Sequence, residues 1–188
     1  LTITAFSFNY NYCPGVLSHV KAFRGDAGAS SAMAAVISTN NNMTLSYLEG
    51  GWIQHEPTRS YAVYFVLCVD CTLDHIRTYN SVFMLSTSRR TKVTNLDHCD
   101  KFIGYTQGTA NHYLATMATC WDCVMDGVTV GFGGLIPNVQ PPGYLCYLTS
   151  SYNCSIRNVG TRANPINTGT WRPNKYATLY AVYCGGTK

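Results

Sequence analysis

The hydrophobic and aromatic positions at the start of the chain alternate with a period of two over residues 1–12. Even positions carry Thr, Phe and Tyr, whereas odd positions carry Leu, Ile, Ala, Ser and Asn. Side chains of a β-strand alternate between its two faces, so this pattern predicts a strand with one aromatic face. We expect Phe6, Phe8 and Tyr10 to be buried, either in this domain or in a neighbouring subunit. The residues of such an assembly strand are Leu1, Ile3, Phe6, Phe8, Tyr10 and Tyr12.

Short strand-like runs separated by turn sequences continue along the rest of the chain. They cover 43–48, 60–69, 79–87, 111–120, 127–132, 143–149 and 175–184, with weaker runs at 16–23 and 101–106. The segment 29–38 reads equally well as a helix or as a buried strand. Short strands between turns rich in Gly, Pro and Asn are typical of sandwiches and barrels. The sequence therefore predicts an all-β, antiparallel β-sandwich or barrel-like domain with at most one short helix. An N-terminal strand, 1–13, available for exchange with a neighbouring subunit, precedes a single domain, 14–188.

Charged residues are scarce. They make up 12% of the chain, about half of the usual share of roughly 25%, and the net charge is +4. The basic residues are dispersed apart from Arg89, Arg90 and Lys92, which we interpret as a solvated turn, so no nucleic-acid partner is expected. No apolar run reaches the length of a transmembrane helix, so no membrane span is expected. Low charge together with fourteen Tyr residues favours a β-sheet protein at an extracellular surface.

Cysteines and glycosylation motifs strengthen this extracellular prediction. N-glycosylation sequons begin at Asn42 and Asn153. Dense cysteines in a chain of low charge indicate a secreted, disulfide-stabilised domain, and the spacing of Cys146 and Cys154 suits a hairpin-closing disulfide. An odd number of cysteines leaves one thiol free or paired with another subunit; Cys13 is our candidate, and a buried free cysteine is the alternative. The nine disulfide candidates are Cys13, Cys68, Cys71, Cys99, Cys120, Cys123, Cys146, Cys154 and Cys184.

Two cysteine pairs belong to a faint internal repeat. Residues 61–74 and 113–126 both read Tyr, six residues and then C-x-D-C-x-x-D. Duplication and independent strand-then-turn chemistry explain this repeat equally well. Two C-x-x-C units could form a zinc site, but their long separation and the secreted context favour disulfides between the repeats, or to Cys99 and Cys184.

The acidic residues of the repeat are too sparse for a calcium loop, in which nearly every second residue supplies an oxygen. We expect Asp70, Asp74, Asp122 and Asp126 to cap turns through backbone amides instead. The sequence therefore predicts no metal site and no cofactor.

The chain contains no recognisable catalytic motif. Its five histidines lie outside nucleophile and metalloprotease motifs, and its only glutamates are Glu49 and Glu56, which gives no support for a glycosidase pair. We therefore predict a secreted, non-enzymatic structural or adhesion subunit that self-assembles into a fibre or oligomer by N-terminal strand addition. One alternative is a monomeric extracellular domain, lectin-like or barrel-like, that binds glycans or a small ligand. Another is a small secreted hydrolase that uses dispersed His and Asp residues.

Overall fold

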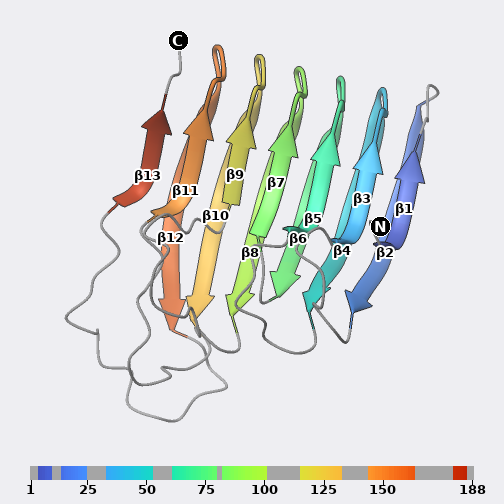
Figure 1. The fold of residues 1–188 in the computed structure, drawn as a ribbon, viewed down its shortest axis with the longest axis horizontal. Helices are drawn as coiled ribbons and strands as arrows, with labels where there is room; N and C mark the ends of the chain where they lie inside the picture. The colour runs from blue at the N-terminus through green and yellow to red at the C-terminus, as the bar shows by residue number, and fades with distance from the viewer. Residues whose placement is uncertain are drawn as a thin grey trace.

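The computed structural model describes residues 4–9, 14–24, 33–52, 61–79, 82–100, 115–132, 144–163 and 180–185. Every secondary-structure element in these ranges is a β-strand, and the strands form two sheets (Figure 1). Sheet A contains, in spatial order, β1 (Thr4–Asn9), β3 (Met33–Ser38), β5 (Tyr61–Val66), β7 (Val82–Ser86), β9 (Ala115–Ala118), β11 (Tyr144–Thr149) and β13 (Tyr180–Gly185). Sheet B contains β12 (Ser155–Ala163), β10 (Val124–Phe132), β8 (Lys92–Asp100), β6 (Thr72–Tyr79), β4 (Met43–Trp52) and β2 (Gly15–Arg24).

All strand pairs in both sheets are parallel. The chain alternates between the sheets, so that one strand of sheet A, a turn and the following strand of sheet B form one coil. Coil 1 contains β1 and β2, coil 6 contains β11 and β12, and β13 opens a seventh coil. Figure 1 shows the odd-numbered strands running one way, the even-numbered strands running the other way, and tight turns joining them along one edge. This architecture is a parallel β-solenoid.

The predicted antiparallel sandwich or barrel is therefore wrong, although the all-β class is confirmed. Turns rich in Asn, Asp and Ser have the same composition in two different settings. They can join two neighbouring strands of one sheet as a hairpin, or they can carry the chain into a second sheet. Here consecutive strands lie in different sheets, so these turns are corners and not hairpins. The predicted disulfide stabilisation is also wrong for the described residues, because all seven of their characterised cysteines have free thiols.

The turns from sheet A to sheet B contain five residues in coils 3 to 6 and four residues in coil 2, where β4 begins one position earlier. The first and the fourth residue of each turn have left-handed backbone conformations. Asn and Asp tolerate this conformation better than other non-glycine residues, and they occupy four of the five fourth positions. The fourth residues are Asn42, Asp70, Arg90, Asp122 and Asn153, with φ between 45° and 54°.

A further left-handed residue lies inside each described strand of sheet B. These residues are His19, Tyr47, His75, Asn95, Gly127 and Asn158. The left-handed residue bends the strand, so the inward positions on either side of it are three residues apart and not two. In β6, for example, Leu73 and Ile76 are both buried. This spacing breaks the period-two pattern, which is why β6, β8 and β12 are absent from the sequence prediction.

The hydrophobic core lies between the two sheets, where equivalent inward residues stack along the solenoid axis. Phe65 and Phe83 are both buried, and their ring centroids lie 5.7 Å apart. Among the residues with described side chains, the hydrophobic ones that are only partly buried against the core belong to coil 1 or coil 6: Phe8, Leu17, Val20, Cys154, Ile156 and Val159. The core is therefore least shielded from solvent in these two coils.

The N-terminal strand is present as β1, which pairs with β3 of its own chain. Phe8 lies opposite Ile37 in this pair and is partly buried against the core. Phe6 also belongs to β1, but its side chain lies outside the described part of the structure, as do the assembly residues Leu1, Ile3, Tyr10 and Tyr12. Exchange of this strand between copies remains a prediction.

Two further expectations concern single segments. In 29–38 the buried-strand interpretation is correct for Met33–Ser38, which forms β3, and Ile37 is fully buried there. The run 101–106 lies outside the described residues.

Candidate functional site

Equivalent polar residues of successive coils form rows along the solenoid axis. We call the row of fourth turn residues the turn ladder: Asn42, Asp70, Arg90, Asp122 and Asn153. We call the row of left-handed residues in sheet B the mid-strand ladder: His19, Tyr47, His75, Asn95, Gly127 and Asn158. A third row, the charge row, follows the strand register through Lys21, Glu49, Arg77 and Asp97. Neighbouring strands are about 4.8 Å apart, so members of a row can contact each other directly.

In the turn ladder, side chains of adjacent coils bind each other. Arg90 donates two hydrogen bonds to Asp70, from Nε to Oδ1 at 2.6 Å and from Nη2 to Oδ2 at 2.7 Å. The Arg90 guanidinium lowers the pKa of Asp70, and Asp70 in turn raises the pKa of Arg90. Between coils 5 and 6, Asn153 Nδ2 donates to Asp122 Oδ1 at 2.6 Å. The ladder thus connects neighbouring coils on the outside of the turns.

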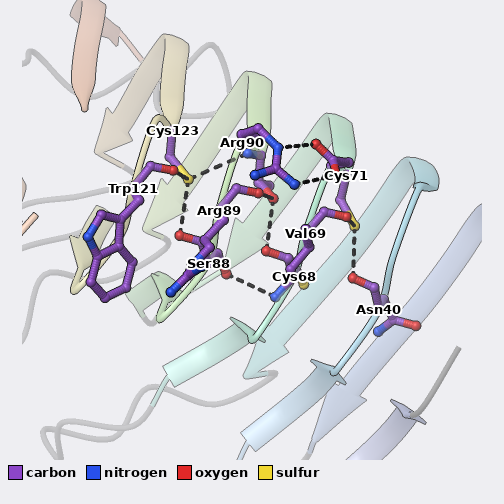
Figure 2. A network of polar contacts seen from close by, with 11 residues as sticks. Asn40, Cys68, Val69, Cys71, Ser88, Arg89, Arg90, Trp121 and Cys123 are labelled. Atoms are coloured by element: carbon purple, nitrogen blue, oxygen red, sulfur yellow. Dashed lines mark hydrogen bonds and ion pairs between the residues drawn. The ribbon is translucent and has the colours of Figure 1, made fainter. Parts of the chain in front are cut away.

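Inside the turns, a second row connects the same coils. The second turn residues are small and buried: Asn40, Cys68, Ser88, Cys120 and Ser151. Ser88 Oγ accepts a hydrogen bond from the Cys68 amide at 3.1 Å and donates one to the carbonyl two residues before it (Figure 2). Ser151 Oγ likewise accepts a hydrogen bond from the Cys120 amide, at 3.0 Å, and donates one to the carbonyl two residues before it. A serine hydroxyl in one coil therefore satisfies a cysteine amide in the coil before it.

In both C-x-D-C turns the two thiols lie inside the corner and hydrogen-bond to each other. This bond and burial raise the pKa of Cys68, while the same bond lowers the pKa of Cys71 to about 7. Cys120 and Cys123 show the same opposite shifts for the same reason. All four residues are fully buried or nearly so, so any chemistry at these sulfur atoms requires the turn to open.

The second thiol of each pair also reaches the preceding coil. Cys71 Sγ donates to the Asn40 carbonyl at 3.4 Å, and Cys123 Sγ donates to the Ser88 carbonyl at 3.5 Å (Figure 2). The two C-x-D-C units therefore occupy equivalent turns, two coils apart, and the faint repeat in the sequence reflects the coil repeat of the solenoid.

The predicted hairpin-closing disulfide between Cys146 and Cys154 is wrong, because both thiols are free. Cys146 is buried inside β11, and this burial raises its pKa to about 12. Cys154 is the last residue of the turn into β12, a strand of the other sheet, so no hairpin exists for it to close. Cys184 is exposed on β13. Cys13 and the side chain of Cys99 lie outside the described part of the structure.

Aromatic rings and amides build the mid-strand ladder. The ring of Tyr47 stacks between those of His19 and His75, at centroid distances of 4.9 and 4.8 Å. In coil 6, Asn158 Nδ2 donates to Asp126 Oδ1 of coil 5 at 2.7 Å. Stacking covers the faces of the Tyr47 ring, so this residue presents mainly its edge and hydroxyl to solvent.

Asp74 lies beside this ladder and binds three neighbours. Its Oδ1 accepts hydrogen bonds from Thr94 Oγ1 at 2.6 Å and from Asn95 Nδ2 at 2.8 Å, and its Oδ2 lies 2.6 Å from His75 Nδ1. Partial burial raises the pKa of Asp74, but these hydrogen bonds outweigh it and bring the pKa down to about 2. The carboxylate is thus held in its charged form.

The charge row alternates in sign from coil to coil. Lys21 Nζ lies 3.3 Å from Glu49 Oε2, and Arg77 Nε lies 2.9 Å from Asp97 Oδ2. Opposite charges on adjacent strands attract, whereas like charges in these positions would destabilise the sheet.

An exposed basic and aromatic group lies on the turns of coils 4 to 6. The Arg89 guanidinium lies over the Trp121 ring, 5.1 Å from its centroid, a cation–π geometry. Tyr152 follows Trp121 in the next coil and is 58% exposed. Arg90 and Lys92 are also exposed. These side chains place positive charge beside aromatic rings on the outside of the solenoid.

The four aspartates of the faint repeat lie in two separate rows. Asp70 and Asp122 belong to the turn ladder, whereas Asp74 and Asp126 lie next to the mid-strand ladder. All four bind side chains of a neighbouring coil, whereas we expected backbone amides. Among the described residues, no group of three or more His, Cys, Asp or Glu side chains has a geometry suited to a metal ion.

Both sequons lie at equivalent positions of the coil repeat. Asn42 and Asn153 are left-handed and exposed, and the third sequon residues, Thr44 and Ser155, lie at the start of a strand. Left-handed turns favour Asn, and strands accept Thr and Ser on their solvent face, so the turn itself tends to generate this motif. Glycosylation of either residue remains a prediction.

The ladders themselves were not predicted, although the sequence carries a signal for them. The segments that begin at Asn40, Cys68, Ser88, Cys120 and Ser151 share a common order of residue types. The first residue is small, the second is variable, the third has a left-handed backbone and the fourth points inward. Two apolar residues, three positions apart, then follow in the strand of sheet B. An alignment of all five segments on this order, and not of two alone, would have shown the coil repeat.

No protein-family model and no curated protein matches this chain. A crystal structure from Parabacteroides merdae, assigned only provisionally as a glycosyl hydrolase, aligns with 96% of this chain and 80% of its own length, at 8% identity and a TM-score of 0.23. So low a TM-score supports no inference about fold or activity. The described part of the chain contains no helix long and apolar enough to cross a membrane.

Proposed function

We propose that this protein is a non-enzymatic structural subunit of an extracellular assembly, in which solenoids join end to end through the edge strands of their sheets. Low charge and the two sequons support the extracellular location. The structural role and the mode of joining are supported by separate observations.

The observation that carries the structural role is the use of the acidic side chains. Six carboxylates have described side chains, and each of them binds a side chain of an adjacent coil. They are Glu49, Asp70, Asp74, Asp97, Asp122 and Asp126. A general acid or base needs a carboxyl group that can reach a ligand, whereas these groups hold neighbouring coils together. A rigid, elongated structural subunit requires such contacts between its coils.

The edge strands support assembly. Natural proteins usually protect exposed sheet edges with charge or proline. Neither β1 nor β13, the outermost described strands of sheet A, contains a charged residue or a proline. The partly buried core residues also lie in coils 1 and 6, next to these edges. A second copy placed there would pair backbone groups and bury apolar surface together.

Sedimentation velocity of the purified chain over a range of concentrations, with reductant present, tests this function. We expect particles larger than one chain that grow with concentration. Cys184→Lys puts a charge on the exposed edge side chain of β13 and should reduce assembly, whereas Leu67→Lys, on an exposed turn of coil 3, should not. A single-chain mass at every concentration would contradict assembly.

A second candidate function is glycan binding at the exposed turns. Arg89, Trp121 and Tyr152 favour it, because sugars bind to surfaces that combine aromatic rings with hydrogen-bond donors. A glycan array with the native chain and with Trp121→Ala would test it. Binding that is lost in the variant supports this function, and no binding by the native chain contradicts it.

A further inference from the structure

We propose that Arg89, Trp121 and Tyr152 bind a glycan that carries carboxylate groups on its sugar rings, with the glycan chain lying along the solenoid axis. We call these three residues the binding row. This inference rests on the second candidate function, glycan binding, and specifies the residues that hold the ligand, the class of glycan and the direction of its chain. It is independent of whether copies of the protein assemble.

The binding row follows the coil repeat. Each of its members is the third residue of its turn, and backbone bridges pair Arg89 with Trp121 and Trp121 with Tyr152. Neighbouring strands, and hence successive coils, are about 4.8 Å apart, which is close to the length of one pyranose residue in an extended glycan. A glycan that runs along the axis can therefore place consecutive sugar residues over consecutive turns.

The two aromatic rings of the binding row do not stack on each other, although their turns are adjacent. In the mid-strand ladder, by contrast, the Tyr47 ring stacks between those of His19 and His75, so both of its faces are already covered. Trp121 is half-buried and Tyr152 is 58% exposed. Ring surface that no neighbouring ring covers can pack against the apolar face of a sugar ring.

The guanidinium of Arg89 supplies the charge that selects an acidic glycan. It lies over the Trp121 ring, from the neighbouring turn (Figure 2). Within the described part of the structure, its N–H groups donate no side-chain hydrogen bond and form no ion pair. Arg90, by comparison, already donates to both carboxylate oxygens of Asp70. A guanidinium with free donors can bind a carboxylate through two parallel hydrogen bonds.

The surrounding charges favour the same ligand. The two carboxylates of the described turns, Asp70 and Asp122, each bind a side chain of an adjacent coil. Lys92 is exposed in the same coil as Arg89 and has no ion-pair partner among the described residues. Two unpaired positive charges suit a glycan with spaced carboxylates. A nucleic acid, with a charge on every nucleotide, draws its affinity from a larger set of basic residues.

The test measures binding of the full-length chain to oligosaccharides of hyaluronan, alginate and polygalacturonate, and to the methyl esters of the same oligosaccharides, by titration calorimetry. Esterification removes the charge of the carboxylates and keeps the sugar rings. We expect at least one acidic oligosaccharide to bind, and its ester to bind about tenfold more weakly, which corresponds to about 1.4 kcal/mol.

Three variants assign this binding to the row. Arg89→Gln should weaken binding of the acidic oligosaccharide about tenfold and leave binding of the ester unchanged. Arg157→Gln removes an equal exposed charge from β12 in sheet B and, as the matched control, should change neither. Trp121→Ala should abolish binding of both forms, and Tyr152→Ala applies the same test if Trp121→Ala does not fold.

Each outcome supports or overturns the inference. Equal binding of acid and ester, equal effects of Arg89→Gln and Arg157→Gln, or binding of neutral glycans alone would overturn the selection of an acidic ligand, while glycan binding stands. Native affinity in folded Trp121→Ala would show that the glycan binds elsewhere. No binding to any acidic, esterified or neutral glycan would contradict glycan binding as well. A single-stranded oligonucleotide that binds more tightly than every oligosaccharide would assign the row to nucleic acid instead.

Discussion

Arg90 and Asp70 face each other across the turns of coils 4 and 3, and the guanidinium binds both carboxylate oxygens, at 2.6 and 2.7 Å. Both residues have left-handed backbones. This conformation is unfavourable for arginine, so Arg90 occupies a position where Asn or Asp would fit the backbone better. The bidentate pair offsets part of that cost and aligns the two turns.

Arg90→Ala should therefore lower the melting temperature in dilute buffer, and high salt should reduce the difference from the native chain, since salt screens exposed ion pairs. Lys92→Ala removes an equal charge from the same coil and serves as the control. Thermal unfolding followed by circular dichroism at two salt concentrations checks this expectation. Equal losses for the two variants would show that Asp70 gives Arg90 no special role.

Asp74 should make stability depend on pH in the acidic range. Its pKa is about 2 in the folded chain, below its ordinary value of 3.8. The unfolded state therefore binds the proton more tightly, so the stabilisation is complete above about pH 4 and is lost as the pH falls toward about 2. Urea unfolding of the native chain and Asp74→Asn should show a constant difference in unfolding free energy at neutral pH that shrinks in acid. A difference that is independent of pH would contradict this role.

How much the sequence predicts depends on which sheet a strand belongs to. The strands of sheet A keep a period-two pattern, and the sequence predicts all of them as strands except β3, whose segment reads equally well as a helix; in β5, for example, Val63 and Phe65 alternate inward. The strands of sheet B were recognised less often, because a left-handed residue such as His75 or Asn95 shifts their inward positions. The pairing partner of each strand could not be predicted, because each strand pairs with the equivalent strand of the next coil, which is distant in the sequence. For the same reason the ladders could not be predicted from local motifs.

Gly51 should not tolerate a side chain. Its φ is +152°, and a Cβ there would collide with the backbone of Tyr79, whose amide nitrogen would lie 2.8 Å away. We expect Gly51→Ala to cost about 1–3 kcal/mol of unfolding free energy. Gly160→Ala is the control, because nothing lies within 4 Å of a Cβ at that position. Urea denaturation measures both; equal stability of the two variants would refute the close approach.

Ser88 should stabilise the inside of the turns through its hydroxyl. The hydroxyl binds the Cys68 amide in the preceding coil, and Ser88 is fully buried. Ser88→Ala leaves that amide without its partner and should lower the unfolding free energy by about 1–3 kcal/mol. Ser88→Cys keeps a weaker acceptor of similar size, so its unfolding free energy should lie between those of the native chain and Ser88→Ala. Thr72→Ala, which removes an exposed hydroxyl, should change the unfolding free energy little. A neutral Ser88→Ala would show that water or a shifted backbone replaces the bond.

Access, and not acidity, should govern the reactivity of the thiols. Cys71 has a pKa of about 7, yet it is buried, whereas Cys184 is exposed. Brief treatment of the native chain with iodoacetamide, followed by peptide mass spectrometry, should therefore label Cys184 and spare Cys71 and Cys146. In denaturant without reductant, all seven thiols that are free in the structure should take the label. Rapid native labelling of Cys71 would show that its turn opens readily. Missing label on both cysteines of a C-x-D-C turn in denaturant would show that the pair had been oxidised.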